Sequence, residues 1–127
     1  MTKKFEYQAR EILEKVTPTP MVENGLTQEQ KIDKIAEHFR EILGILGLDL
    51  SNDSLQESPK RIAKMYVKEI FKGLHTENFP KVTVIENEMK YDQMIVVRDV
   101  AIISTCEHHF VTIDGKATIA YIPNGKV

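Results

Sequence analysis

The stretch TCEHHF at residues 105–110 gathers four side chains that can bind a metal ion or transfer a proton. Cys106 is the only cysteine of the chain, and His109 follows it at the C-x-x-H spacing of two adjacent ligands of a tetrahedral zinc ion. Residues three apart on a strand face opposite sides, so this pair can share one ion only in a sharp turn. A zinc site needs at least three protein ligands, and the spacing alone leaves open a lone buried thiol beside surface histidines.

The other polar side chains near this pair have roles that depend on the metal. His108 lies between the two predicted ligands, where an imidazole beside an activated water can act as general acid or base. Glu107 could orient a metal ligand through a hydrogen bond, and an ordinary surface glutamate is the equal alternative. His38 and His75 are expected at the surface or at a boundary. The sequence therefore offers two good metal ligands and no convincing third.

A second group of candidate residues is basic and helical. Four cations recur at spacings of three and four residues, which places them on one helix face: Arg61, Lys64, Lys68 and Lys72. Arg61 also falls near the predicted start of its helix, where the helix dipole disfavours a cation. A bound anion such as phosphate would resolve that conflict, and a solvated helix face is the alternative.

Composition restricts the class of protein. A chain of 127 residues with 42% apolar residues fits one domain with a real core. The net charge is −2, which argues against a general nucleic-acid binder. One cysteine cannot form an intrachain disulfide, and no stretch resembles a signal peptide or a membrane helix. We therefore expect a soluble, cytoplasmic protein with no membrane partner.

A break in the helical pattern divides the N-terminal part from the rest of the chain. Apolar residues at helical spacing predict a helix over residues 3–16. The following TPTPMVENG, residues 17–25, breaks that pattern with prolines, an asparagine and a glycine. The break either lets the first helix sit apart or is a simple loop between helices. We divide the chain into residues 1–26, an N-terminal helix and loop, and residues 27–127, the main domain.

Two further helices are marked by their ends. Thr27 and Gln30 predict a capping box at the start of a long amphipathic helix that ends at Gly47. Ser58 as N-cap, with Pro59 at the first helical position, predicts a third helix that runs on to the next glycine.

The second half of the chain reads as strands. Runs rich in valine, isoleucine and threonine occupy residues 81–89, 93–105 and 116–123. The middle run is apolar on both faces, which predicts a central strand covered on both sides. TIDGK, residues 112–116, carries a turn signal between the second and third runs. The predicted fold class is α+β, with N-terminal helices followed by an antiparallel meander.

Two long blocks make the chain resemble a known family. ESPKRIAKMYVKEIFKGL and VRDVAIISTCEHHFVTIDGKATIAYIPNGKV are similar to GTP cyclohydrolase I, and the resemblance extends from about residue 30 onward. The resemblance implies an antiparallel tunnelling fold that assembles into a homodecamer. It also implies zinc-dependent hydrolysis of GTP to formate and 7,8-dihydroneopterin triphosphate, the first step towards folate and related pterins.

The family pattern assigns roles to single residues. It implies that Cys106 and His109 are zinc ligands and that His108 is the adjacent acid/base group, which protonates the imidazole nitrogen of the purine. It also implies that Arg61 and Lys64 help to hold the triphosphate, in agreement with the basic helix face.

The resemblance also implies what lies beyond Val127. Members of the family continue with two helices and a strand that carry a second cysteine ligand, a glutamate that anchors guanine, and further phosphate ligands. We therefore expect an incomplete chain, inactive alone and with an open sheet edge. The alternative is a naturally short, non-enzymatic paralogue that assembles with or regulates a full-length cyclohydrolase. A different tunnelling-fold enzyme for a related purine or pterin is a third reading, which the unbroken CEHHF block disfavours.

Overall fold

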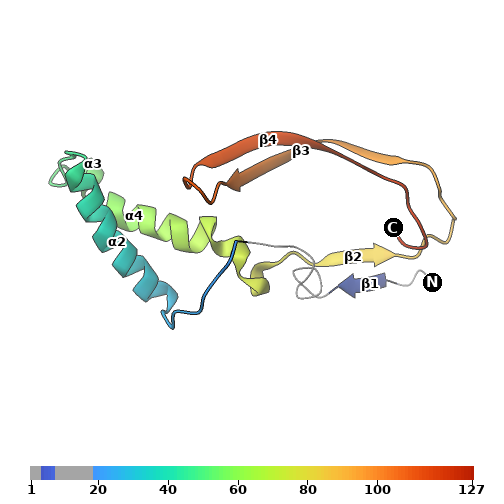
Figure 1. The fold of residues 1–127 in the computed structure, drawn as a ribbon, viewed down its shortest axis with the longest axis horizontal. Coiled ribbons are helices and arrows are strands. Elements are labelled where there is room, and N and C mark those ends of the chain that lie inside the picture. The colour runs from blue at the N-terminus through green and yellow to red at the C-terminus, as the bar shows by residue number, and fades with distance from the viewer. Residues whose placement is uncertain (1–3, 8–18) are drawn as a thin grey trace. The chain divides into compact units, whose positions relative to one another are not determined.

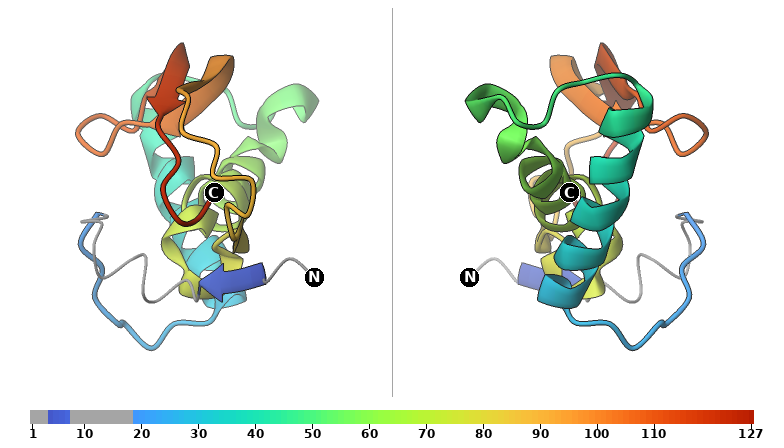
Figure 2. Two further views of the ribbon diagram at one scale, coloured as in Figure 1. Left: turned by 90° about the vertical axis from the view of Figure 1, so that its right-hand side faces the viewer. Right: turned by 90° about the vertical axis from the view of Figure 1, so that its left-hand side faces the viewer.

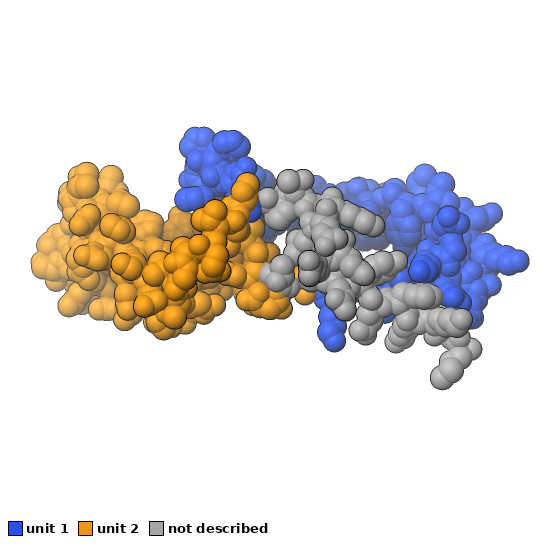
Figure 3. Space-filling view, turned by 60° about the horizontal axis from the view of Figure 1, so that its bottom comes forward, with its two compact units in different colours: residues 1–19, 80–127 blue, residues 20–79 orange. Residues whose placement is uncertain are grey.

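The structure, a computed structural model, describes residues 4–7 and 19–127 and divides into two compact units. We call residues 20–79 the helical unit, and residues 1–19 with 80–127 the strand unit (Figure 3). The predicted α+β class, with helices followed by an antiparallel sheet, is confirmed. No helix among the described residues is both long and apolar enough to cross a membrane.

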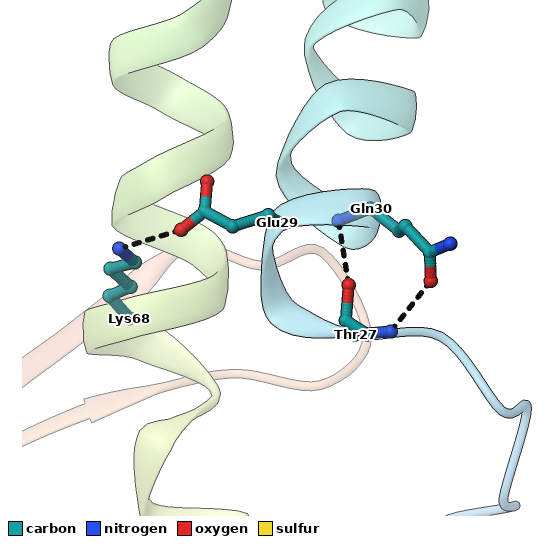
Figure 4. A network of polar contacts seen from close by, with 4 residues as sticks. All are labelled: Thr27, Glu29, Gln30 and Lys68. Atoms are coloured by element: carbon teal, nitrogen blue, oxygen red, sulfur yellow. Dashed lines mark hydrogen bonds and ion pairs between the residues drawn. The ribbon is translucent and has the colours of Figure 1, made fainter.

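The helical unit contains two main helices and several short ones (Figure 1). Its elements are α2 (Gln28–Ile45), α3 (Asp53–Gln56), α4 (Ser58–Met65), a π-helix (Tyr66–Ile70) and two 3₁₀ turns (Lys72–Leu74 and Thr76–Asn78). The predicted capping box is confirmed. The amide of Gln30 donates to Thr27 Oγ1 at 3.3 Å, and the amide of Thr27 donates to Gln30 Oε1 at 2.9 Å (Figure 4). Gly47, with a φ of 80°, follows the C-cap and ends the helix as predicted.

The third helix begins and continues differently from the prediction. Ser58 is not its N-cap: Glu57 takes that position and Ser58 is already helical. The reason is α3, which ends at Gln56, so the chain enters α4 while it is still turning. The helix is also not regular to Gly73, because a π-helix follows Met65.

The core of the helical unit lies between α2 and the α4–π-helix segment, which run side by side in Figures 1 and 2. Ile32 and Ala63 are fully buried, and Val67 is 9% exposed. The ring of Phe39 stacks on the ring of Tyr66, with centroids 5.6 Å apart and planes 14° from parallel. Burial of a large apolar side chain such as Ile32 stabilises the folded state by roughly 1.5–3 kcal/mol, so this small cluster holds the two helices together.

The first strand pair corrects the N-terminal prediction. Residues 4–7 of the predicted helix form β1 (Lys4–Tyr7), which pairs antiparallel with β2 (Val82–Ile85). The sequence KFEY alternates polar and aromatic residues, so its period of two also fits a strand. Residues 8–16 of the predicted helix lie outside the described part of the chain.

A second neighbour lies on the other edge of β2. The backbones of Ile85 and Val127 exchange two hydrogen bonds, at 2.6 and 2.9 Å, and the amide of Asn87 donates to Gly125 O at 3.1 Å. The predicted meander is therefore wrong: within the described residues, β2 pairs with β1 and the 125–127 segment rather than with the next strand. The period-2 pattern shows which residues are extended, but it does not select their partners.

The remaining strands, β3 (Ile95–Thr105) and β4 (Thr112–Tyr121), form a long antiparallel hairpin. The register steps between the pairs Val97↔Ile119 and Val100↔Ala117, which leaves one extra residue on β3. This β-bulge holds Asp99 at a φ of 57°, and Asp99 Oδ1 lies 3.7 Å from Lys116 Nζ. The predicted turn at residues 112–116 is wrong, because TIDGK is part of β4 and the chain reverses earlier.

Candidate metal turn and phosphate-binding face

The chain reverses at the CEHHF residues themselves. Thr105 pairs with Thr112 as the last rung of the hairpin, and the amide of Cys106 then donates to Val111 O at 2.9 Å. The amide of Phe110 donates to Cys106 O at 2.8 Å, which closes a tight turn with residues 107–109 at its tip. The loop that joins β3 and β4 is visible in Figures 1 and 2. The predicted sharp turn is confirmed, and we call residues 106–111 the metal turn.

Phe110 takes a backbone conformation that is rare for a bulky residue. Its φ is 54°, in the left-handed region that favours glycine, and its side chain is 51% exposed. Such a conformation costs on the order of 1–2 kcal/mol, which the hydrogen bonds at the base of the hairpin offset. Strained residues of this kind collect where a loop must present side chains in a fixed arrangement.

The turn brings Cys106 close to a histidine. Cys106 Sγ lies 3.8 Å from His108 Nδ1, with Cys106 half-buried and both His108 and His109 exposed. His109 makes no hydrogen bond or ion pair within residues 19–127. The thiol and imidazole donors of the turn have the chemistry that zinc prefers. No group of three potential metal ligands occurs among the described residues. The donors of the turn therefore fit two positions of a zinc site and leave the others to be supplied.

Glu107 makes a contact that sequence reasoning missed. Thr19 Oγ1 donates a hydrogen bond of 2.8 Å to Glu107 Oε2, although the two residues are 88 positions apart. The sequence gives no signal for this pair, because exposed threonines and glutamates form no periodic pattern. Glu107 thus has a specific partner, and the choice between a residue that orients a ligand and an ordinary surface glutamate stays a prediction.

The basic face of α4 is divided by the π-helix. Arg61 and Lys64 are exposed and make no ion pair within the described residues. Lys68 belongs to the π-helix, and its Nζ lies 3.3 Å from Glu29 Oε1 on α2 (Figure 4). Of the four predicted cations, Lys68 is therefore engaged by a carboxylate, and Arg61 and Lys64 are the pair available to an anion on α4.

The other two histidines lie in the helical unit, each beside a glutamate near in sequence. His38 Nδ1 is 3.9 Å from Glu41 Oε2, and His75 Nδ1 is 4.0 Å from Glu77 Oε1. Both distances are long for a direct bond, so these contacts hold the rings only loosely. Neither arrangement points to a metal site.

Comparison with known proteins identifies the family. The family model described as GTP cyclohydrolase I matches residues 35–127, which include α4, the metal turn and both long strands. The chain belongs to the GTP cyclohydrolase I family.

Individual relatives support the match over the same region. The chain is 65% identical over 109 residues to the GTP cyclohydrolase 1 of Aliivibrio fischeri strain MJ11, covering 86% of this chain and 50% of that protein. It is 58% identical over 116 residues to the GTP cyclohydrolase 1 of Shewanella amazonensis, covering 91% of this chain and 54% of the relative. The chain thus spans about half the length of the curated relatives that it matches.

Proposed function

We propose that the protein is a zinc-dependent GTP cyclohydrolase I, which hydrolyses GTP to formate and 7,8-dihydroneopterin triphosphate. The observation that carries the proposal is the family match across residues 35–127, within which Cys106, His108 and His109 lie in one closed turn. The proposal concerns the whole protein, because this chain spans about half of the relatives' length.

Cys106 and His109 are the residues that would hold the zinc ion in this proposal. Both lie in the metal turn, and their thiolate and imidazole donors suit zinc. A third ligand would come from residues beyond those described. When bound, zinc supplies Lewis-acid activation of the water used in hydrolysis.

His108 would act as the general acid of the reaction. Its ring is exposed, and the contact of its Nδ1 with Cys106 Sγ leaves Nε2 as the nitrogen for proton transfer. In this role, His108 donates a proton to the imidazole nitrogen of the purine as the ring opens. Such a positioned acid contributes roughly 10²–10⁴-fold to the rate.

Arg61 and Lys64 would bind the triphosphate. Both are exposed on α4, where Lys64 lies in the last turn, so the side-chain charges rather than the helix dipole would attract the anion. Because the triphosphate takes no part in the bond changes, its binding energy serves to position the reacting end of the nucleotide.

Assembly and location complete the proposal. We propose a homo-oligomer, a decamer as in the family, in the cytoplasm. The unpaired edges of the β3–β4 hairpin among the described residues support assembly through strands, since an open edge readily pairs with another chain.

The decisive experiment measures formate and oxidised neopterin released from GTP by the purified, zinc-loaded protein in its longest natural form. The zinc-loaded protein is expected to turn over GTP steadily. Residues 1–127 alone are expected to show no turnover, because two ligands are too few to hold zinc tightly. A zinc-loaded full chain that leaves GTP intact would overturn the proposal.

A non-enzymatic partner of a full-length cyclohydrolase is the second candidate function. It is favoured by the large apolar side chains that the β3–β4 hairpin leaves exposed, since such surfaces are usually buried against another chain. Co-expression with a full-length cyclohydrolase separates the two candidates. A stable mixed oligomer, in which this chain adds no turnover of its own, would support the partner role.

A further inference from the structure

The tip of the metal turn is tied to a distant part of the chain. Thr19 Oγ1 donates to Glu107 Oε2 at 2.8 Å, and both residues belong to the strand unit. Glu107 lies directly between Cys106 and His108, so any restraint on Glu107 acts on both neighbours. A hydrogen bond to an ionised carboxylate is shorter and stronger than one between neutral groups.

Backbone hydrogen bonds hold the base of the turn. The two backbone hydrogen bonds of the turn involve Cys106, Phe110 and Val111, below the tip. Within the described residues, the other contact made by a tip side chain is the 3.8 Å approach of His108 to Cys106. Among the described residues, Thr19 therefore provides a hydrogen bond that reaches the tip from outside the hairpin.

Thr19 is well suited to act as an anchor. Pro20 follows it, and a proline restricts the preceding residue to extended backbone conformations. Thr19 is also half-buried, and its β-branched side chain has few rotamers. The hydroxyl thus comes from a residue with restricted backbone and side-chain freedom, so less freedom is lost when the bond forms.

We propose that Thr19 is a positioning residue for the metal turn, an inference that rests on the proposed function. By holding the Glu107 carboxylate, Thr19 fixes the orientation of the tip and keeps a competing oxygen ligand away from the thiolate and imidazole donors. Partners that orient a metal site through a hydrogen bond change metal affinity by about 10–100-fold when they are lost.

The test measures Co²⁺ affinity in the full natural chain, using the absorption of the thiolate–cobalt bond as readout. Thr19→Val keeps the shape of the side chain and removes the hydroxyl, so it is expected to weaken Co²⁺ binding by about tenfold. Thr19→Ser keeps the hydroxyl and should retain most of the affinity. Thr118→Val makes the same change at an exposed threonine of β4 and should have no effect.

A double-mutant cycle separates positioning from a general effect on folding. In a Glu107→Ala background, Thr19→Val should cause no further loss of affinity, because the partner is already gone. Equal Co²⁺ affinity of Thr19→Val and the unchanged protein overturns the proposal, as does an equal loss in the Glu107→Ala background.

Failure of the proposed function gives a different result. If the unchanged protein shows no thiolate–cobalt absorption, the metal assignment is wrong, and amide hydrogen exchange of residues 107–110 then tests the anchor. Faster exchange in Thr19→Val supports the anchor and unchanged exchange overturns it.

Discussion

At the scale of single residues, the two histidines of the metal turn differ in their surroundings. His108 Nδ1 lies 3.8 Å from Cys106 Sγ, whereas His109 has no hydrogen bond or ion pair within residues 19–127. An imidazole without a partner in the protein is free to bind an ion, and one already oriented can hold a proton at a defined nitrogen. The structure is thus compatible with the proposed division between ligand and acid, which substitutions can test.

Substitution of each histidine by glutamine should separate the two roles. His108→Gln should lower kcat by roughly 10²–10⁴-fold and leave zinc content unchanged, because only the acid is lost. His109→Gln should lose zinc together with activity. His38→Gln, at an exposed position of α2, serves as the control. Loss of zinc in His108→Gln with retention in His109→Gln would reverse the assignment.

Residue types in the turn could be predicted from sequence, but their contacts could not. The C-x-x-H spacing required a sharp turn, and the turn is present. The left-handed backbone of Phe110 was unpredictable, because phenylalanine gives no local signal for positive φ. The Thr19–Glu107 bond depends on tertiary structure across 88 residues, which no local pattern encodes.

At the scale of elements, the end of α2 offers a matched pair of glycines. Gly44 lies inside the helix, and a Cβ added there would meet no atom within 4 Å. Gly44→Ala should therefore stabilise the protein by about 0.5–1 kcal/mol, since alanine loses less backbone entropy in a helix. Gly47 has a φ of 80°, so Gly47→Ala should destabilise by about 1 kcal/mol. Thermal unfolding of both variants checks this prediction. A change of the unfolding temperature in the same direction for both would contradict the position of Gly44 inside the helix and of Gly47 after its end.

The π-helix gives a second prediction, about the cations of α4. Arg61→Met and Lys64→Met should each raise KM for GTP by about tenfold with little change in kcat, because they remove binding to an unreactive group. Lys68→Met should leave KM nearly unchanged, since Lys68 is paired with Glu29. Its loss should cost at most about 1 kcal/mol of stability, as for an exposed ion pair. Steady-state kinetics measures these changes in KM. An equal rise in KM for Lys68→Met would mean that Lys68 also binds the triphosphate.

Signals at the ends of elements were more reliable than signals inside them. The capping box of Thr27 and Gln30 is a local pattern with a local cause, and it appears as predicted. The π-helix after Met65 breaks the 3.6-residue period without any proline or glycine to mark it. TIDGK carries turn residues, yet long pairing with β3 keeps it extended, which shows tertiary structure overriding local preference.

At the scale of the whole molecule, the bulge of β3 decides which surface is apolar. It restores the face on which Val100 and Ile102 lie, so that they share it with Ile95 and Val97 despite the odd spacing. We call this side the apolar face; it comprises Ile95, Val97, Val100, Ile102, Ile113, Ala117, Ile119 and Tyr121. The opposite face is mixed: it carries Val96, Ala101 and Ile103 of β3 together with Asp114, Lys116 and Thr118 of β4. Apolar residues thus occur on both faces of β3, as the sequence indicates, but the predicted cover is absent among the described residues, since Val97 is 47% exposed on one face and Ile103 is 77% exposed on the other.

The proposed assembly would cover this exposed apolar face, and adjacent residues of β4 can test this. Ile119→Lys places a charge on the apolar face opposite Val97. If another chain covers this face, the lysine is removed from water without a partner, which is costly. Assembly should therefore weaken, and smaller species should form. Thr118→Lys places the same charge one residue away on the opposite face, across from the bulge at Asp99, and should leave assembly unchanged. Sedimentation velocity of the full natural chain distinguishes the two. Unchanged sedimentation of Ile119→Lys would mean that this face stays in water, whereas a loss of assembly in both variants would point to the hairpin edge instead.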